Sequence, residues 1–160
     1  DHPTARLVIA WSGLGECPRR YQRRITERIA ARRLGEHVDV LGWVDVVRLL
    51  SASSLLATPY LCGYSSQVFP NIVLEALAMG IPVVTTPLAQ WSDLLDPNLH
   101  IAPLRKAQVY ADVMSAYLGR PEATRRTEGC HDRYRACSFH PQQVVSRYRE
   151  VYKMVLDEQP

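Results

Sequence analysis

The sequence lacks the long apolar runs and the short catalytic motifs that mark several large protein classes. No apolar run approaches the roughly 20 residues that a membrane-spanning helix requires. The P-loop, the Gly-x-Ser-x-Gly elbow and the His-Glu-x-x-His zinc motif are all absent. No charged-then-apolar targeting segment is visible at the amino end either. We therefore expect neither a transmembrane span nor any of these three kinds of site.

Cysteine is scarce and scattered. The chain contains four cysteines, Cys17, Cys62, Cys130 and Cys137. Their placement indicates reduced thiols of a cytosolic protein rather than a disulfide framework. Two of them could gather round zinc with His131 and His140, but the spacings match no common zinc site. We expect small buried thiols and surface imidazoles, and no bound metal.

Lysine is nearly missing, with 2 residues against 17 arginines, yet the net charge is only +3. Such a mild surplus makes no strong case for nucleic acid as a partner. Seven of the arginines fall between positions 19 and 33, mostly opposite an apolar stripe. They indicate a solvated helix face or, alternatively, a contact with an anionic membrane surface or a lipid-linked acceptor.

The apolar pattern predicts one domain, residues 1–160, of the α/β class. The expected strands are Leu7–Trp11, Val38–Leu41, Leu55–Thr58, Pro82–Thr86 and Leu99–Ala102. The expected helices are Arg19–Leu34, closed by Gly35, then Asp45–Ser51, Asn71–Met79, Lys106–Leu118, and two polar ones near 121–136 and 141–157. Alternating strands and helices predict a Rossmann-like, doubly wound parallel sheet with C-terminal helices, whose ligands bind at the carboxyl ends of the strands.

The most informative segment runs from Gln67 to Val83. Pro70 suits the first turn of a helix, where its missing N–H would have no partner. Gly80 can take the left-handed conformation that closes this helix, and an apolar strand follows at once. The helix therefore opens at the mouth of a sheet, where its free N–H groups and its positive dipole end attract phosphate.

This segment resembles the donor site of retaining glycosyltransferases with two Rossmann-like domains (the GT-B type), especially family 4. In that family a Glu, seven residues and a second Glu precede Ala-x-Ala-x-Gly-x-Pro-Val. Glu75 occupies the position of the second Glu, and Gln67 replaces the first. The resemblance implies that the residue at position 67 contacts the donor sugar near the reacting carbon. It also implies that Glu75 accepts hydrogen bonds from the nucleotide ribose.

The resemblance extends from Leu7 to about Leu156 and implies further donor contacts. Val68, Phe69, Pro70, Asn71 and Ile72 would line the sugar and diphosphate. Trp43 lies in a loop that commonly sits beside the base, and Asp93 stands in a segment that usually contacts the sugar. The family's first strand, its basic diphosphate-binding turn and its N-terminal acceptor domain have no counterpart in this sequence.

Each of these interpretations has a plainer alternative. Glu75 could be a solvated helix carboxylate, and Trp43 could close the core as such aromatics often do. Gln67 can hold sugar hydroxyls, but it supplies neither negative charge nor a proton acceptor. The apolar stripe along residues 144–155 favours packing against the flank of the sheet, whereas the resemblance allows a helix that crosses to the other domain.

The sequence thus predicts the donor-binding domain of an enzyme that moves a sugar from a nucleotide diphosphate to an acceptor with retention. No metal or cofactor is expected. The partners would be the nucleotide sugar and a glycan or lipid-linked acceptor held by the N-terminal domain, in the cytoplasm or at the inner face of the membrane. The chain alone should not transfer sugar. A non-catalytic binding module and a sugar-nucleotide epimerase of the same architecture are the alternatives.

Overall fold

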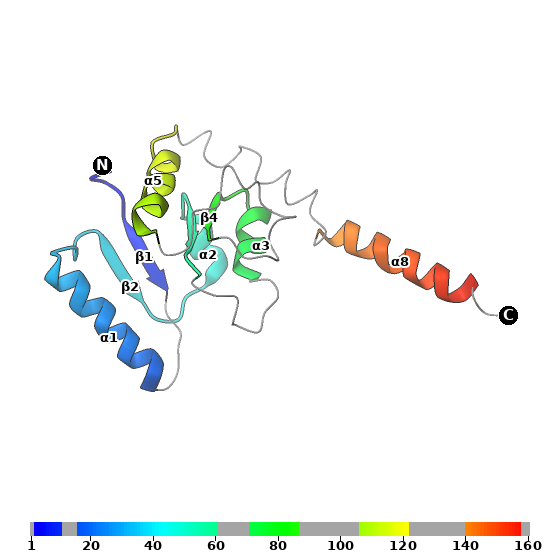
Figure 1. Ribbon diagram of the computed structural model, residues 1–160, viewed down its shortest axis with the longest axis horizontal. Coiled ribbons are helices and arrows are strands. Elements are labelled where there is room, and N and C mark those ends of the chain that lie inside the picture. Colours follow the sequence, from blue (N-terminus) through cyan, green and yellow to red (C-terminus); the bar gives the residue numbers. More distant parts are fainter. Residues whose placement is uncertain (1, 11–15, 61–70, 87–105, 122–139, 158–160) are drawn as a thin grey trace. The chain divides into compact units, whose positions relative to one another are not determined.

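The computed structural model describes residues 2–10, 16–60, 71–86, 106–121 and 140–157. Of residues 16–18 it describes the backbone alone. Along the chain lie β1 (Leu7–Ala10), α1 (Glu16–Ala31), β2 (Val38–Leu41), α2 (Val46–Ser51), β3 (Leu56–Thr58), α3 (Asn71–Ala78), β4 (Val83–Thr85), α5 (Ala107–Leu118) and α8 (Pro141–Asp157) (Figure 1). The chain divides into two compact units, Asp1–Leu49 and Leu50–Pro160. Strands alternate with helices and pair in parallel, so the predicted α/β class is confirmed.

The first unit contains a short parallel pair, β1 and β2. Their register runs from Leu7 opposite Val38 to Ala10 opposite Leu41. At its start Arg6 forms an exposed ion pair with Asp39, with the Arg6 Nη2 atom 3.0 Å from Oδ2. Exposed pairs of this kind contribute at most about 1 kcal/mol, so the backbone ladder rather than this pair fixes the register.

Helix α1 ends earlier than the sequence pattern predicts. Arg33, not Gly35, takes the left-handed conformation, with a φ of 55°. The N–H of Leu34 then donates to the carbonyl of Ile29, and that of Arg33 to the carbonyl of Ala30. These two bonds satisfy the last carbonyls of the helix in the usual glycine-type closure. The predicted closure at Gly35 is therefore wrong, because Arg33 accepts a backbone conformation that costs roughly 1–2 kcal/mol outside glycine.

The second unit holds the buried core. The side chains of Val73, Ala76 and Leu77 on α3 have no exposed surface, and they pack with Leu50, Ile81 and Val83. Gly80 has a φ of 69°. The N–H of Ile81 donates to the carbonyl of Ala76 at 2.8 Å. The closure of α3 at Gly80 and the fully buried strand after it are both as predicted.

Strands β3 and β4 pair in parallel, with Leu56 opposite Val83 and Thr58 opposite Thr85. Three side-chain hydroxyls reinforce the carboxyl end of this pair, and we call them the hydroxyl cluster: Thr85, Thr86 and Tyr110. Thr85 donates to the carbonyl of Thr58 at 3.2 Å, and Thr86 donates to the carbonyl of Tyr60. Tyr110, on α5, donates to the carbonyl of Val84. The cluster joins β3, β4 and α5 at one edge.

Helix α8 does not pack as the sequence predicts. None of its residues is buried, and Tyr148, Val151 and Tyr152 are 61%, 53% and 65% exposed. The predicted packing of this stripe against the sheet is therefore not found.

Among the described helices, none combines the length and the apolar character needed to cross a membrane. The expected strand Leu99–Ala102 and the helix near 121–136 lie outside the described residues.

A matched pair of substitutions tests the hydroxyl cluster. The Thr58 hydroxyl is buried and has no hydrogen-bond partner within the described part of the chain, whereas the buried Thr85 hydroxyl donates to a backbone carbonyl. Thr85→Val should lower the free energy of unfolding by about 1 kcal/mol. Thr58→Val should leave it unchanged or raise it, because an unmet hydroxyl is removed. Urea unfolding measures both, and equal losses would contradict this assignment.

The pH dependence of stability tests the burial of the Tyr110 hydroxyl. Burial raises the pKa of Tyr110 to about 12; the bond from the Thr58 backbone lowers it and nearby Tyr60 raises it further. The unfolded chain would release this proton near pH 10. The stabilisation is therefore complete below about pH 10 and is lost as the pH rises toward about 12.

The stability difference between wild type and Tyr110→Phe should accordingly be about 1 kcal/mol near neutral pH and should shrink between about pH 10 and 12. Urea unfolding across this range measures it. Tyr148→Phe, at a tyrosine that is 61% exposed, is the control and should show no such trend. A difference for Tyr110→Phe that stays constant through pH 12 would refute the role of its hydroxyl.

Candidate functional site

The candidate site lies at the carboxyl edge of the β3–β4 pair. Because both strands run in the same direction, the chain leaving each one emerges at the same edge. The helix between them must run back along the strands, so α3 begins at this edge, and Figure 1 shows it alongside β4. The bond from Thr86 to the Tyr60 carbonyl holds the two emerging segments together beyond the last paired residues. The start of α3 is thus fixed beside two tethered strand ends.

The first turn of α3 can receive an anion. Asn71 is exposed, Ile72 is half-buried, and the turn contains no acidic residue that would neutralise the positive end of the helix. The opposite face is anchored, because Val73, Ala76 and Leu77 are completely buried. Fixed N–H groups at a helix start attract phosphate and carboxylate groups.

Glu75 lies in the second turn of α3, as the sequence predicts. Its side chain is exposed, on the same face as Asn71 and Ala78. The carboxylate forms no hydrogen bond or ion pair with any described residue. It can therefore accept hydrogen bonds from the hydroxyls of a ligand without first giving up a contact with any of these residues.

Trp43 does not close the core, so that alternative is wrong. Its ring is 85% exposed, in the loop that follows β2 in the first unit. An exposed indole offers a face on which a planar base could stack. Tyr60 behaves differently: it is half-buried, it packs against the core of the second unit, and burial raises its pKa. Trp43 belongs to the first unit and Glu75 to the second.

Several predicted donor contacts lie outside the described residues. These are Gln67, Val68, Phe69, Pro70 and Asp93.

Of the four residues considered as zinc ligands, only His140 lies within the described residues. Within the described ranges, no three His, Cys, Asp or Glu side chains come together in a way that could hold a metal ion.

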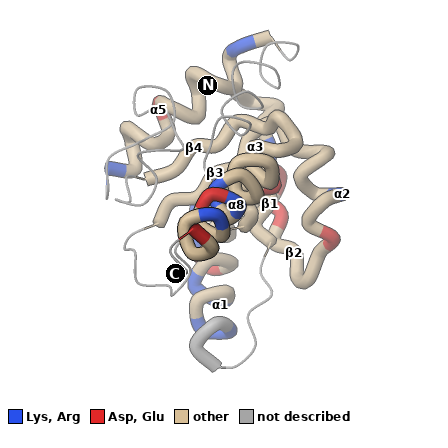
Figure 2. The backbone as a smooth tube through the Cα atoms, turned by 90° about the vertical axis from the view of Figure 1, so that its right-hand side faces the viewer, with Lys and Arg blue, Asp and Glu red and all other residues tan. Residues whose placement is uncertain are grey.

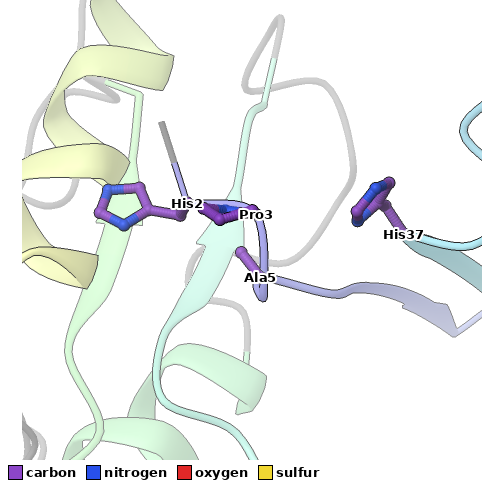
Figure 3. A pocket seen from close by; sticks show the side chains of 4 residues that line it. All are labelled: His2, Pro3, Ala5 and His37. Atoms are coloured by element: carbon purple, nitrogen blue, oxygen red, sulfur yellow. The ribbon is translucent and has the colours of Figure 1, made fainter.

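A shallow pocket in the first unit was not expected from the sequence. His2, Pro3, Ala5 and His37 line about 470 Å³ of space (Figure 3). Figure 3 shows the two imidazole rings on opposite sides of Pro3 and Ala5, where they do not face each other. None of the described residues that line it carries a carboxylate that could orient either ring. Those four residues therefore form neither a metal-binding arrangement nor an acid–base pair.

The sequence reasoning also missed the hydroxyl cluster. Its one signal was the pair of threonines, Thr85 and Thr86, at the end of a strand that is otherwise apolar. A buried hydroxyl needs a hydrogen-bond partner, so two in succession indicate backbone carbonyls within reach. No sequence pattern indicated that Tyr110 belongs to the cluster, because the two residues joined by its hydrogen bond, Tyr110 and Val84, are 26 positions apart.

Comparisons with known proteins bear on the family and the fold of the chain. The family model described as "Glycosyl transferases group 1" matches residues 1–120. A search of curated proteins finds no match. Among solved structures, the chain is similar to the pneumococcal O-GlcNAc transferase GtfA in complex with UDP and GlcNAc, with a TM-score of 0.62 and 17% sequence identity.

That match covers 94% of this chain but 29% of the GtfA chain, so this chain spans less than a third of the length of that transferase. At such low identity the likeness shows the fold, which is that of a GT-B glycosyltransferase domain. The family model covers three quarters of the chain, including α3 and the β3–β4 pair. The chain therefore belongs to the group 1 glycosyltransferase family.

Proposed function

We propose that this chain is the donor-binding domain of a retaining, family 4-like glycosyltransferase that uses a nucleotide-diphosphate sugar. One observation carries the proposal: α3 begins at the carboxyl edge of a parallel strand pair, with Asn71 and Glu75 exposed on one face and the opposite face buried. Ligands of such folds bind at this edge. The UDP bound to GtfA is consistent with the same class of donor.

In this proposal the diphosphate lies at the start of α3, near the N–H groups of Asn71 and Ile72, and is also lined by Pro70. The ribose hydroxyls donate to Glu75. The donor sugar contacts Gln67 and the backbone of Val68 and Phe69. Trp43 stacks on the base, and Asp93 accepts a bond from a sugar hydroxyl.

Transfer breaks the bond between the anomeric carbon and the phosphate oxygen and forms a bond to an acceptor oxygen on the same face. The helix amides stabilise the charge that grows on the departing diphosphate, without any need for a metal ion. A basic pair outside this chain would assist them. Gln67 cannot accept the proton of the acceptor hydroxyl, so the departing phosphate oxygen receives it.

The acceptor would be a glycan or a lipid-linked sugar, held by an N-terminal domain that faces this one. The enzyme would work in the cytoplasm, with a peripheral contact at the inner face of the membrane. The chain by itself should bind the donor weakly and transfer nothing, because it would hold only half of the cleft.

A second candidate is a non-catalytic binding module of the same fold. Gln67 favours it, because an amide in place of the expected acid cannot stabilise a positive centre at the anomeric carbon. Calorimetric titration with a panel of nucleotide sugars separates the two. No heat with any donor supports the module, whereas donor binding with turnover in the protein that includes the acceptor domain supports the enzyme.

Removing the Glu75 carboxylate should weaken donor binding without harming the fold. Hydrogen bonds to a charged group contribute about 1.5–3 kcal/mol, so Glu75→Ala should raise the Kd for the best donor roughly 10- to 100-fold. The melting temperature should hardly change, because the side chain is exposed. Glu150→Ala, at an exposed glutamate of α8, is the matched control and should bind like wild type. Unchanged affinity in Glu75→Ala would remove the ribose contact from the proposal.

Position 67 should affect turnover rather than binding. In the protein that includes the acceptor domain, Gln67→Ala should keep the donor Kd within about threefold of wild type but lower kcat by roughly 10²-fold in a transfer assay, because the lost contact orients the reacting sugar. Gln67→Glu restores the residue usual in the family and should transfer at least as fast as wild type. A Gln67→Ala variant that loses binding and turnover equally would show that this side chain only holds the donor.

A further inference from the structure

The positive charge of the protein is concentrated in one short segment. Residues 19–33 contain seven arginines and one glutamate, a formal charge of +6, while the whole chain carries +3. The remaining residues are therefore net negative, at −3. The chain is not basic overall; it carries one strongly basic surface on α1 and the turn that follows it.

The structure places these charges on the outer side of α1. Gln22, Ile25 and Ile29 are half-buried and mark the side of the helix that packs. Four exposed arginines lie round the opposite side at helical spacing, and we call them the α1 basic face: Arg20, Arg23, Arg24 and Arg28. Figure 2 shows basic positions along α1. The helix has 16 residues, so the face extends over about 24 Å.

This arrangement does not stabilise the helix. Arg20 and Arg24, and Arg24 and Arg28, are like-charged neighbours four positions apart, which disfavour a helix. Among the described ion pairs only that of Arg23 with Glu27, at 3.6 Å, offsets them. Arg28 lies in the last turn, where the dipole favours a cation, so the unfavourable contribution is the repulsion between neighbouring arginines. An anion bound from outside the chain would relieve the repulsion between these arginines.

The chemistry of the face selects the anion. A guanidinium group binds phosphate oxygens with two parallel hydrogen bonds, which an ammonium group cannot do. Binding of single-stranded nucleic acid would call for a series of aromatic rings between the cations, whereas α1 carries a single aromatic residue, Tyr21, which is 52% exposed. A row of arginines with one aromatic ring on an exposed helix matches a plane of phosphate headgroups.

We propose that the α1 basic face docks the protein on an anionic phospholipid surface. The proposal deepens the membrane location given under the proposed function but does not depend on the donor chemistry, since it concerns the first unit and not α3. The protein would rest on headgroup phosphates through arginine side chains alone, because the apolar side of α1 is turned to its own unit. Binding should therefore be electrostatic and reversible.

Sedimentation with lipid vesicles tests the proposal on the whole chain. In about 0.1 M salt, wild type should bind vesicles of phosphatidylcholine with about a third phosphatidylglycerol, and should not bind phosphatidylcholine alone. The triple variant Arg20→Gln, Arg24→Gln, Arg28→Gln should lose at least about tenfold in partitioning. Binding of wild type should also fall steeply as salt is raised, because screening shortens the reach of surface charges.

The matched control is Arg147→Gln, Arg149→Gln, Lys153→Gln, which removes the same charge from exposed positions of α8. It should bind anionic vesicles within about twofold of wild type. Equal losses in both triple variants, equal binding to neutral vesicles, or tighter binding of wild type to a short DNA duplex would each overturn the proposal. Calorimetry with the donor should give the same Kd for the α1 variant and wild type, so failure of docking and failure of donor binding are told apart.

Discussion

The hydrogen bonds that Thr85, Thr86 and Tyr110 donate to backbone carbonyls are the constraint on which the site depends. Strands β3 and β4 are three residues long each, so their ladder alone gives little resistance to fraying. The side-chain hydrogen bonds of the cluster add to the backbone bonds between β3 and β4, at the place where the chain leaves the sheet. A site built at the end of a sheet needs strand ends that stay together.

The same edge shows why a helix of eight residues can carry a binding site. Isolated helices of this length are not stable in water, so α3 exists only through its contacts. Three completely buried side chains, Val73, Ala76 and Leu77, fix one face, and the closure at Gly80 ties the other end to β4. The remaining face, with Asn71 and Glu75, is then exposed but not free to move, which is the condition for precise hydrogen bonding to a ligand.

Much of this could be predicted from the sequence, and the exceptions have physical causes. Glycine and proline at their preferred places, Pro70 and Gly80, with the apolar strand after them, identified α3 and β4 because local chemistry determines such boundaries. The end of α1 was wrong because Arg33 tolerates a left-handed backbone that sequence rules reserve for glycine. Trp43 was uncertain because an aromatic at a strand end suits a core or a ligand equally, and only three-dimensional burial distinguishes them. The bond from Tyr110 depends on distant packing, which no local pattern encodes.

The distribution of charge separates the two ways of binding phosphate that we propose for this chain. Residues 50–160 carry as many acidic as basic residues, and the described first and last turns of α3 include no basic side chain. The groups that α3 itself offers to an anion are backbone N–H groups, which are fixed in direction and suit one bound molecule in one pose. Residues 19–33 hold charge on long, mobile arginine side chains, which suit a surface whose phosphates are spread and shifting. A domain that binds a donor precisely and a membrane loosely needs both, and it needs them on different elements.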